Sequence, residues 1–346
     1  MKPRFALAVA ALLVRSALAA EAPPSFRDAR LEDGSGLTPG RALERIGRGA
    51  TPEWMGFSVA AIPKVGDVCC FTSGFEVRGC SLADRDGSWG TNVQDAPSVA
   101  TDMYVLVEAK GGRPTGMRLV SPSCSVDGAG RRLLWLGRVD PEASLGFLGS
   151  LLERGDGDDD LGNKALMAIA YHADGRADDL IAKRALDRSL DEDSRQQAIF
   201  WAGVARGEAG FQLLERVLAS EADGDLRQHA VFALSQSWAA GAVERIKRAA
   251  VEDRDPQVRA HALFCLSQTK APDAGEWIAG RLDAESSDHV REQAVFALSQ
   301  LPDATDWLLR VLRSRREPET VRQALFWLGQ SKDPRALEEI EKILDR

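Results

Sequence analysis

The sequence has no apolar segment long enough to cross a membrane. Its clear hydrophobic run, Phe5–Val14, is ten residues long, whereas a spanning helix needs about 20. Lys2 and Arg4 precede the run, and small residues at Ala17 and Ala19 follow it, which is the layout of a secretory signal. We predict a signal peptide over residues 1–19, no membrane span, and a periplasmic or secreted location.

Catalytic and metal-binding motifs are also missing. The chain has no H-E-x-x-H, no G-x-S-x-G and no phosphate-binding glycine loop. The run Asp156–Asp160 resembles the start of a calcium loop. However, Leu161 stands where that loop requires glycine, and Met167 where it requires an acid. We predict no catalytic residue, no metal site and no cofactor.

Basic residues are outnumbered. The formal net charge is −8, and from Pro141 to Arg346 there are 27 basic and 37 acidic residues. Nucleic-acid affinity depends largely on Lys and Arg displacing counterions from phosphates. We therefore predict no nucleic-acid partner.

Cysteine is scarce, and four of the five copies lie in one stretch: Cys69, Cys70, Cys80 and Cys124. None has the C-x2-C spacing of a metal site, and clustered cysteines in an oxidising compartment form disulfides. Adjacent cysteines rarely bond each other because the geometry is strained. We predict that Cys69 and Cys70 pair with Cys80 and Cys124, in an order that the sequence leaves open.

The N-terminal part separates into two segments. Residues 20–50 are rich in proline, glycine and charge, which predicts a flexible leader. Residues 51–139 contain β-type segments, with a strand at Trp54–Ile62, a hairpin at Met103–Cys124 and a strand at Leu133–Leu136. We predict a small disulfide-stapled β or α+β domain.

The remainder of the chain repeats itself. Five similar stretches are anchored on alanines spaced by 32, 32, 32 and 30 residues, and a degenerate copy, ALMAIA, begins at Ala165. The anchors are Ala198, Ala230, Ala262, Ala294 and Ala324. Amphipathic segments lie between them, so each unit is a helix pair that buries its apolar faces only by stacking. For residues 140–346 we predict an all-α superhelical solenoid of about six helix pairs plus a C-terminal capping helix.

The units resemble HEAT-like repeats of the phycobilisome-lyase type, through the pattern V-R-x-x-A-[LV]-F-x-L-[SG]-Q. This resemblance implies a scaffold that serves binding proteins, chromophore lyases and hydroxylases. The hydroxylases of this type hold a di-iron centre through His-Glu dipeptides. Here each histidine is followed by alanine or valine, so the resemblance does not extend to the di-iron site. The four histidines are His172, His229, His261 and His289.

A charged ladder recurs on the packed side of the repeats. An arginine stands three residues before four of the anchors, and an acid lies just upstream of each arginine. One interpretation is that these pairs staple neighbouring units, and the other is a ligand-binding row. The residues are Arg195, Arg227, Arg259, Arg291, Asp191, Asp223, Asp255 and Asp288.

Two polar rows occupy a different line of the same helices. One row stands just before the anchors: Gln197, His229, His261, Gln293 and Gln323. The other stands six residues after them: Gln236, Gln268, Gln300 and Gln330. Because these positions are seven apart, they lie on nearly one helix line. The rows form either hydrogen bonds between repeats or a continuous binding face of the kind solenoids use.

These features together favour an exported, non-catalytic scaffold that binds a protein or peptide partner on its solenoid. The alternative is an enzyme or enzyme subunit related to HEAT-repeat lyases or oxidoreductases. Cys265, Trp201 and Trp327 share one repeat position. We assign the thiol to the core. The two tryptophans are either core residues, which we favour, or exposed anchors for a partner.

Overall fold

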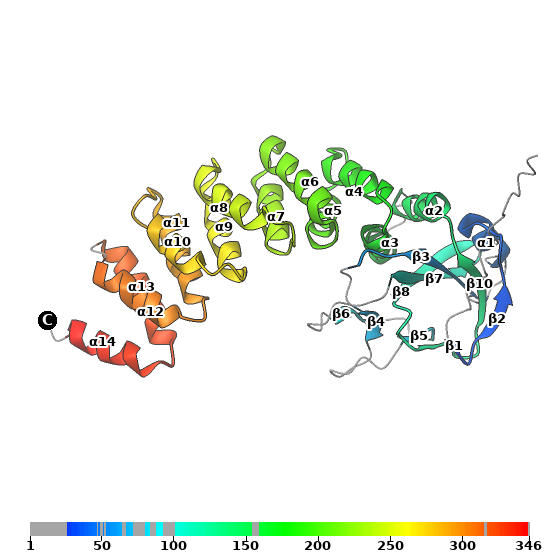
Figure 1. The fold of residues 1–346 in the computed structure, drawn as a ribbon, viewed down its shortest axis with the longest axis horizontal. Helices are drawn as coiled ribbons and strands as arrows, with labels where there is room; N and C mark the ends of the chain where they lie inside the picture. The colour runs from blue at the N-terminus through cyan, green and yellow to red at the C-terminus, as the bar shows by residue number, and fades with distance from the viewer. Residues whose placement is uncertain are drawn as a thin grey trace, which may run out of the picture.

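A computed structural model describes residues 26–46, 48, 51, 53–63, 67–71, 80–83, 88–92, 101–153, 159–314 and 317–344. The predicted signal peptide lies outside these residues. Figure 1 shows a β-rich part at one end and a long array of helices leading away from it. No helix in the described ranges is both long and apolar enough to cross a bilayer.

The β-rich part contains ten short strands and one helix among the described residues. The strands are β1 (Phe26–Arg27), β2 (Arg30–Asp33), β3 (Glu53–Ala60), β4 (Asp67–Phe71), β5 (Cys80–Ser81), β6 (Ser88–Asn92), β7 (Asp102–Lys110), β8 (Arg113–Val120), β9 (Val126–Asp127) and β10 (Arg132–Arg138). The helix is α1 (Pro39–Ile46).

A five-stranded sheet organises this part, in the order β2-β10-β3-β7-β8. Strand β10 runs parallel to both β2 and β3, whereas β3, β7 and β8 are antiparallel. Gly111 and Gly112 join β7 to β8 with φ angles of 59° and 78°, a region that glycine adopts without strain. The predicted strands and hairpin therefore all belong to one sheet.

Both faces of this sheet are buried, because side chains alternate along each strand. In β3, Met55 and Phe57 enter the core that the sheet shares with the helices. Trp54 points to the opposite face, where it lies in a second core with Trp135. The strands β1, β9 and β5 form a small sheet that contributes to this second core.

The prediction of a flexible leader is wrong for residues 26–46. Strand β1 pairs with β9, and β2 pairs with β10, each about 100 residues further along the chain. Helix α1 buries Ala42, Leu43 and Ile46 against the sheet. Local composition rich in glycine and proline predicted disorder, but partners distant in the sequence supply the hydrogen bonds and the apolar contact.

Cysteines appear in two settings. Cys80 and Cys124 are buried and disulfide-bonded. Cys265 is a buried free thiol, and burial raises its pKa to about 12, so it is inert at neutral pH. Cys69 and Cys70 lie in β4, but their side chains are outside the described part, so the predicted pairing stays a prediction.

The helical array contains thirteen described helices. They are α2 (Pro141–Glu153), α3 (Asp159–Tyr171), α4 (Arg176–Leu186), α5 (Glu192–Ala205), α6 (Gly207–Ser220), α7 (Gly224–Ser235), α8 (Ala242–Glu252), α9 (Pro256–Gln268), α10 (Ala274–Arg281), α11 (Asp288–Ser299), α12 (Ala304–Ser314), α13 (Pro318–Gln330) and α14 (Pro334–Leu344).

The arrangement of pairs differs from the prediction at the two ends. Helices α3 to α14 form six pairs, in which α3, α5, α7, α9, α11 and α13 carry the anchor alanines and are here named the first helices. Helix α14 is the second helix of the sixth pair and packs on α13 and α12, so it is not an additional cap. The unpaired helix is α2, at the opposite end, where it connects the array to the sheet.

The first helices pack directly on one another along the array. A Cβ atom on Gly203 of α5 would lie 2.2 Å from the carbonyl oxygen of Ala233 in α7, so glycine permits this close approach. The second helices α4, α6 and α8 lie on the outer side of the arc in Figure 1, and α5, α7 and α9 lie on its inner side. From α4 to α9 the array therefore curves around its first helices.

The sheet and the array are joined through a shared apolar core. Phe57 of β3 meets Phe147 of α2 edge to face, with ring centroids 6.2 Å apart. At the end of α3, His172 is fully buried and its Nε2 lies 2.9 Å from the Oγ of Ser144 in α2. The backbone around His172 also pairs with Ala61, just beyond β3. Helices α2 and α3 are thus fixed relative to the sheet.

Candidate binding surface on the inner face

Each first helix from α5 to α13 presents four positions on one line, five residues before the anchor, one before, two after and six after. These positions are spaced i, i+4, i+7 and i+11, so at 100° per residue they fall within about 60° of one another. We name them the inner stripe. Its residues are Asp193, Gln197, Phe200, Val204, Asp225, His229, Phe232, Gln236, Gln257, His261, Phe264, Gln268, His289, Gln293, Phe296, Gln300, Glu319, Gln323, Phe326 and Gln330.

The two predicted polar rows both lie on this stripe, with different exposure. Gln236, Gln268, Gln300 and Gln330 are exposed at or next to the C-terminal ends of their helices. In the other row only Gln197 is exposed, and its four counterparts are half-buried between neighbouring helices.

The amides of the exposed row bond locally. The Nε2 atoms of Gln236, Gln268 and Gln300 donate to the Oγ atom of the preceding serine at 3.0–3.1 Å. Each of these serines in turn donates to the carbonyl of the phenylalanine three residues earlier. These amides therefore fix the ends of their own helices, and the interpretation that they bridge successive repeats does not hold for these bonds.

The histidine pair is positioned by adjacent helices. Burial, followed by the nearby His229, lowers the pKa of His261 below its usual value. The ring of His261 also lies 6.3 Å from that of Phe264, one turn along the same helix. A neutral imidazole at this point presents one donor and one acceptor to a ligand.

The centre of the stripe is a row of aromatic rings, which are not among the binding residues predicted from the sequence. We name Phe200, Phe232, Phe264, Phe296 and Phe326 the Phe ladder. Phe200 and Phe232 stack with centroids 6.2 Å apart, and Phe264 and Phe296 stack at 5.7 Å. The exposed fraction reaches 37% for Phe232 and 52% for Phe326. The recurrence of phenylalanine in all five units was the available sequence signal.

Two tryptophans adjoin the ladder. Trp201 lies between Tyr171 and Phe200, with centroids at 5.4 and 5.2 Å. Trp327 contacts Phe296 at 5.1 Å. Both tryptophans are half-buried, so they belong partly to the core, as predicted from their repeat position, and partly to the edge of the stripe.

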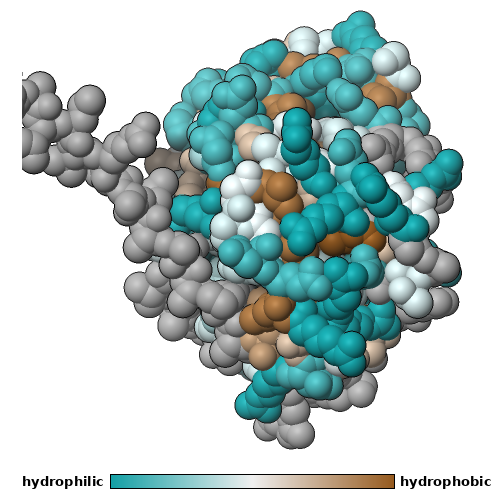
Figure 2. Space-filling view, turned by 90° about the vertical axis from the view of Figure 1, so that its right-hand side faces the viewer, coloured by the Kyte–Doolittle hydropathy of each residue, from teal (hydrophilic) through white to brown (hydrophobic). Residues whose placement is uncertain are grey.

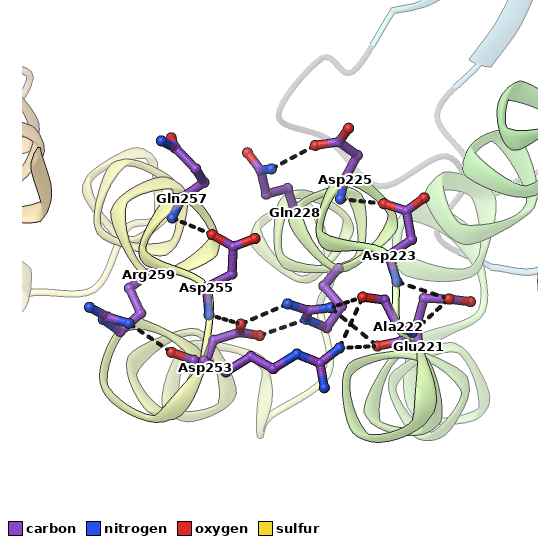
Figure 3. A network of polar contacts seen from close by, with 11 residues as sticks. Glu221, Ala222, Asp223, Asp225, Gln228, Asp253, Asp255, Gln257 and Arg259 are labelled. Carbon is purple, nitrogen blue, oxygen red and sulfur yellow. Dashed lines mark hydrogen bonds and ion pairs between the residues drawn. The ribbon is translucent and has the colours of Figure 1, made fainter.

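The arginines that stand three residues before the anchors lie on the packed side of the helices. Most of their carboxylate partners are not the acids predicted from the sequence. Arg227 is 3% exposed and makes two bonds to Asp253, at 2.9 and 3.0 Å. Its Nη1 donates to the carbonyl oxygens of Glu221 and Ala222. Figure 3 shows this network between the loops that precede α7 and α9.

The same contact recurs along the array. Arg195 pairs with Glu221, and Arg259 pairs with Glu285 at 3.1 Å, so each of these arginines reaches an acid 26 residues later, at the connection that leads from its own unit to the next. Arg291 departs from this pattern and pairs with Asp288 of its own helix. Three of the four arginines therefore bind the connections between consecutive units.

The predicted acids have another role in three cases. Asp191, Asp223 and Asp255 are N-caps whose side chains accept backbone N–H bonds from Ser194, Asp225 and Gln257 respectively. A capping carboxylate satisfies an otherwise unpaired N–H at a helix start. The expected Arg–Asp pairing thus holds only for Asp288, because the other three carboxylates accept N–H bonds at the starts of their own helices.

One group of residues at the start of the array, outside the inner stripe, resembles a catalytic triad. Ser144, His172 and Asp174 lie together, but the Nδ1 of His172 accepts the backbone N–H of Asp174 at 3.2 Å. The proton of the neutral ring is therefore on Nε2, which donates to Ser144 and cannot accept its proton. The side chains of Ser144 and His172 are fully buried, so the role of this group is structural.

Comparison with known proteins agrees with the repeat geometry. Residues 211–299 match the family described as HEAT repeats, and residues 321–346 match the PBS lyase HEAT-like repeat. The chain is a HEAT-like repeat protein. No curated protein matches it.

Two solved structures are similar to this chain, with low sequence identities and low TM-scores. The complex of CpcE and CpcF of phycocyanin lyase from Nostoc sp. PCC7120 matches with 20% identity and a TM-score of 0.34, covering 46% of this chain and all of the other. Human deoxyhypusine hydroxylase in complex with glycerol matches with 18% identity and a TM-score of 0.25, covering 59% and 78% of the two chains. These values carry no functional argument.

Proposed function

We propose that this HEAT-like repeat protein is an exported, non-catalytic scaffold that binds a protein or peptide partner along the inner stripe. The observation that carries the proposal is the continuity of that stripe, where five parallel helices present polar and aromatic side chains at matching positions. Solenoids bind extended partners on such repeated surfaces.

The opposite end of the molecule supports this choice of surface. Seen from the side of the sheet, the described surface is mainly hydrophilic, and its hydrophobic areas are small and separated (Figure 2). Recognition sites stand out as contiguous apolar surface rimmed by polar groups. The inner stripe has that composition.

Export and disulfide formation belong to the same proposal. The basic and apolar segments before Ala20 and the buried, disulfide-bonded Cys80 and Cys124 suit an oxidising compartment. We propose that Cys69 and Cys70 are their partners. Mass spectrometry of the non-reduced, digested protein tests this pairing, and a free thiol at either position would contradict it.

Affinity capture from the periplasmic or secreted fraction tests the scaffold. The full chain is compared with a variant in which His229, His261, Gln268 and Gln300 are replaced by alanine. Loss of the captured protein from the variant supports binding at the stripe, and unchanged capture contradicts it.

The alternative is an enzyme or enzyme subunit related to HEAT-repeat lyases or oxidoreductases, which the match of residues 321–346 to the PBS lyase HEAT-like repeat allows. Iron analysis and an absorption spectrum of the purified full chain distinguish the two. Stoichiometric iron or a visible absorption band would overturn the scaffold proposal.

A further inference from the structure

We infer that the occupant of the inner stripe is an extended, positively charged peptide segment that lies across the first helices along the Phe ladder. This inference rests on the proposed binding function and narrows it to a ligand chemistry.

The first observation is that the ladder is not required by the core. The positions one and four residues after the anchor are buried in α5, α7, α9 and α11, as with Val231 and Leu234 in α7. Phe232 lies between them in sequence and is 37% exposed. Five units carry a phenylalanine at this position, exposed or half-buried, and these rings offer apolar surface and π-faces to a ligand.

The second observation is charge. On the solvent-facing side of α5, α7, α11 and α13, six carboxylates stand against two guanidinium groups, that of Arg322 and that of Arg291, which pairs with Asp288. The carboxylates are Glu192, Asp193, Asp225, Asp288, Glu292 and Glu319. The stripe itself contains acids but no lysine or arginine. Arg322 hydrogen-bonds Glu319, and this bond lowers the pKa of Glu319 to about 2. The unbalanced negative charge is therefore concentrated toward α5 and α7.

The acids and the rings occupy neighbouring lines. Acids lie in the first turns of α5, α7, α11 and α13, and because successive first helices are parallel, these turns form one edge of the inner face. The Phe ladder runs alongside that edge, about two turns further along each helix. A guanidinium or ammonium group over the rings gains a cation–π contact and also lies near a carboxylate.

The third observation is spacing. Packed helices lie about 8–10 Å apart, and an extended chain advances about 3.3 Å per residue. Every third residue of an extended peptide therefore meets a successive first helix. The half-buried imidazoles and the exposed amides on either side of the rings provide donors and acceptors for the backbone of that peptide.

Fluorescence anisotropy with a synthetic probe tests the inference. The probe is a fluorescein-labelled 15-residue peptide of five Arg-Leu-Ser repeats, and the comparison peptide has Glu in place of Arg. We expect saturable binding of the arginine peptide to the full chain, at least about tenfold weaker binding of the glutamate peptide, and weakening by added salt. Equal binding of the two peptides, or no binding of the arginine peptide, overturns the inference.

Variants locate the probe on the ladder. Phe232→Ala with Phe326→Ala is expected to weaken binding about tenfold. The matched control, Val251→Ala with Leu337→Ala, removes exposed apolar side chains from the second helices α8 and α14 and is expected to have no effect. Equal affinity of the two double variants overturns the inference.

Two further measurements test whether the variant folds and whether the acids contribute to binding. Circular dichroism reports whether the double variant folds, and Phe326→Ala alone replaces it if it does not, because this side chain is the most exposed ring of the ladder. Asp193→Asn with Asp225→Asn is expected to weaken binding of the arginine peptide. Binding of the glutamate peptide is expected to be unchanged or tighter. If capture of a natural partner depends on the stripe but no variant affects the arginine peptide, the scaffold function stands and the cationic ligand is wrong.

Discussion

The buried ion pair of Arg227 with Asp253, the residue that caps the end of α8, makes the most specific stability prediction. Replacing Arg227 by methionine keeps an unbranched apolar stem but removes the guanidinium, and it leaves the carboxylate of Asp253 in a site where it is 8% exposed. Removing one partner of a buried ion pair costs about 3–5 kcal/mol, because the remaining charge stays desolvated. The bond that Asp253 accepts from the N–H of Asp255 at 2.9 Å persists and keeps the loss toward the lower end of that range.

A matched control is available on the surface of the same array. Arg310 of α12 and Glu276 of α10 join two helices as an ion pair too, but their side chains are 57% and 69% exposed. Exposed pairs contribute about 0–1 kcal/mol, so Arg310→Met is expected to change the stability little. Replacing Arg227 by Met and Asp253 by Leu together is expected to recover most of the loss, because no unpaired charge remains buried.

Urea unfolding followed by circular dichroism gives the free energies, and hydrogen exchange locates the change. Exchange in Arg227→Met is expected to rise in α7, α8 and α9 while the sheet stays protected, because repeat stability is a sum of local and neighbour terms. Equal destabilisation by Arg227→Met and Arg310→Met would refute the reasoning.

The contribution of the Arg227–Asp253 ion pair to stability also has a defined pH dependence. Burial opposes ionisation of Asp253, but the hydrogen bond from Arg227 and that from the N–H of Asp255 outweigh it, and the pKa is lowered from 3.8. A lowered carboxyl pKa stabilises the fold above the unfolded value and loses that contribution as the pH falls below it. The difference between the wild type and Arg227→Met should therefore shrink below pH 3.8.

Three further outcomes are expected. Gly203→Ala should destabilise by about 1–3 kcal/mol in urea unfolding, since its Cβ would overlap the carbonyl of Ala233, whereas Gly329→Ala, with open space around it, should be neutral or stabilising. Burial lowers the pKa of His172 from 6.5 to about 4, so about 3 kcal/mol of stability, complete above pH 6.5, should be lost by pH 4, and His172→Gln should lack this slope. Mass spectrometry of the exported protein should find a mature chain that begins after Ala19, and retention of residues 1–19 would contradict the signal peptide.

The helical array was predictable because its information is local and repeated. Alanine anchors at a nearly constant spacing, with apolar residues at helical intervals, specify helix pairs that must stack. The same reasoning placed the strand at Trp54–Ile62 and the hairpin that became β7 and β8. It also put the glutamine and histidine rows on one helix line, where the structure has them.

The interactions between units were not predictable in detail. Each arginine pairs with an acid 26 residues later or, in Arg291, with one in its own helix, and nothing in a single repeat distinguishes these choices. The sequence suggested the nearest acids, which instead cap helices. The outcome depends on the path of the loop from one unit to the next.

The sequence by itself determined the helices of the array, the stacking of the units and the side of each helix that faces solvent, because these follow from periodicity along the chain. The tertiary structure alone decided that residues 26–46 join the sheet, that α2 connects the sheet to the array, and that the phenylalanines align as a ladder. Each of these depends on contacts between residues distant in the sequence, and their geometry is fixed only when the elements pack together.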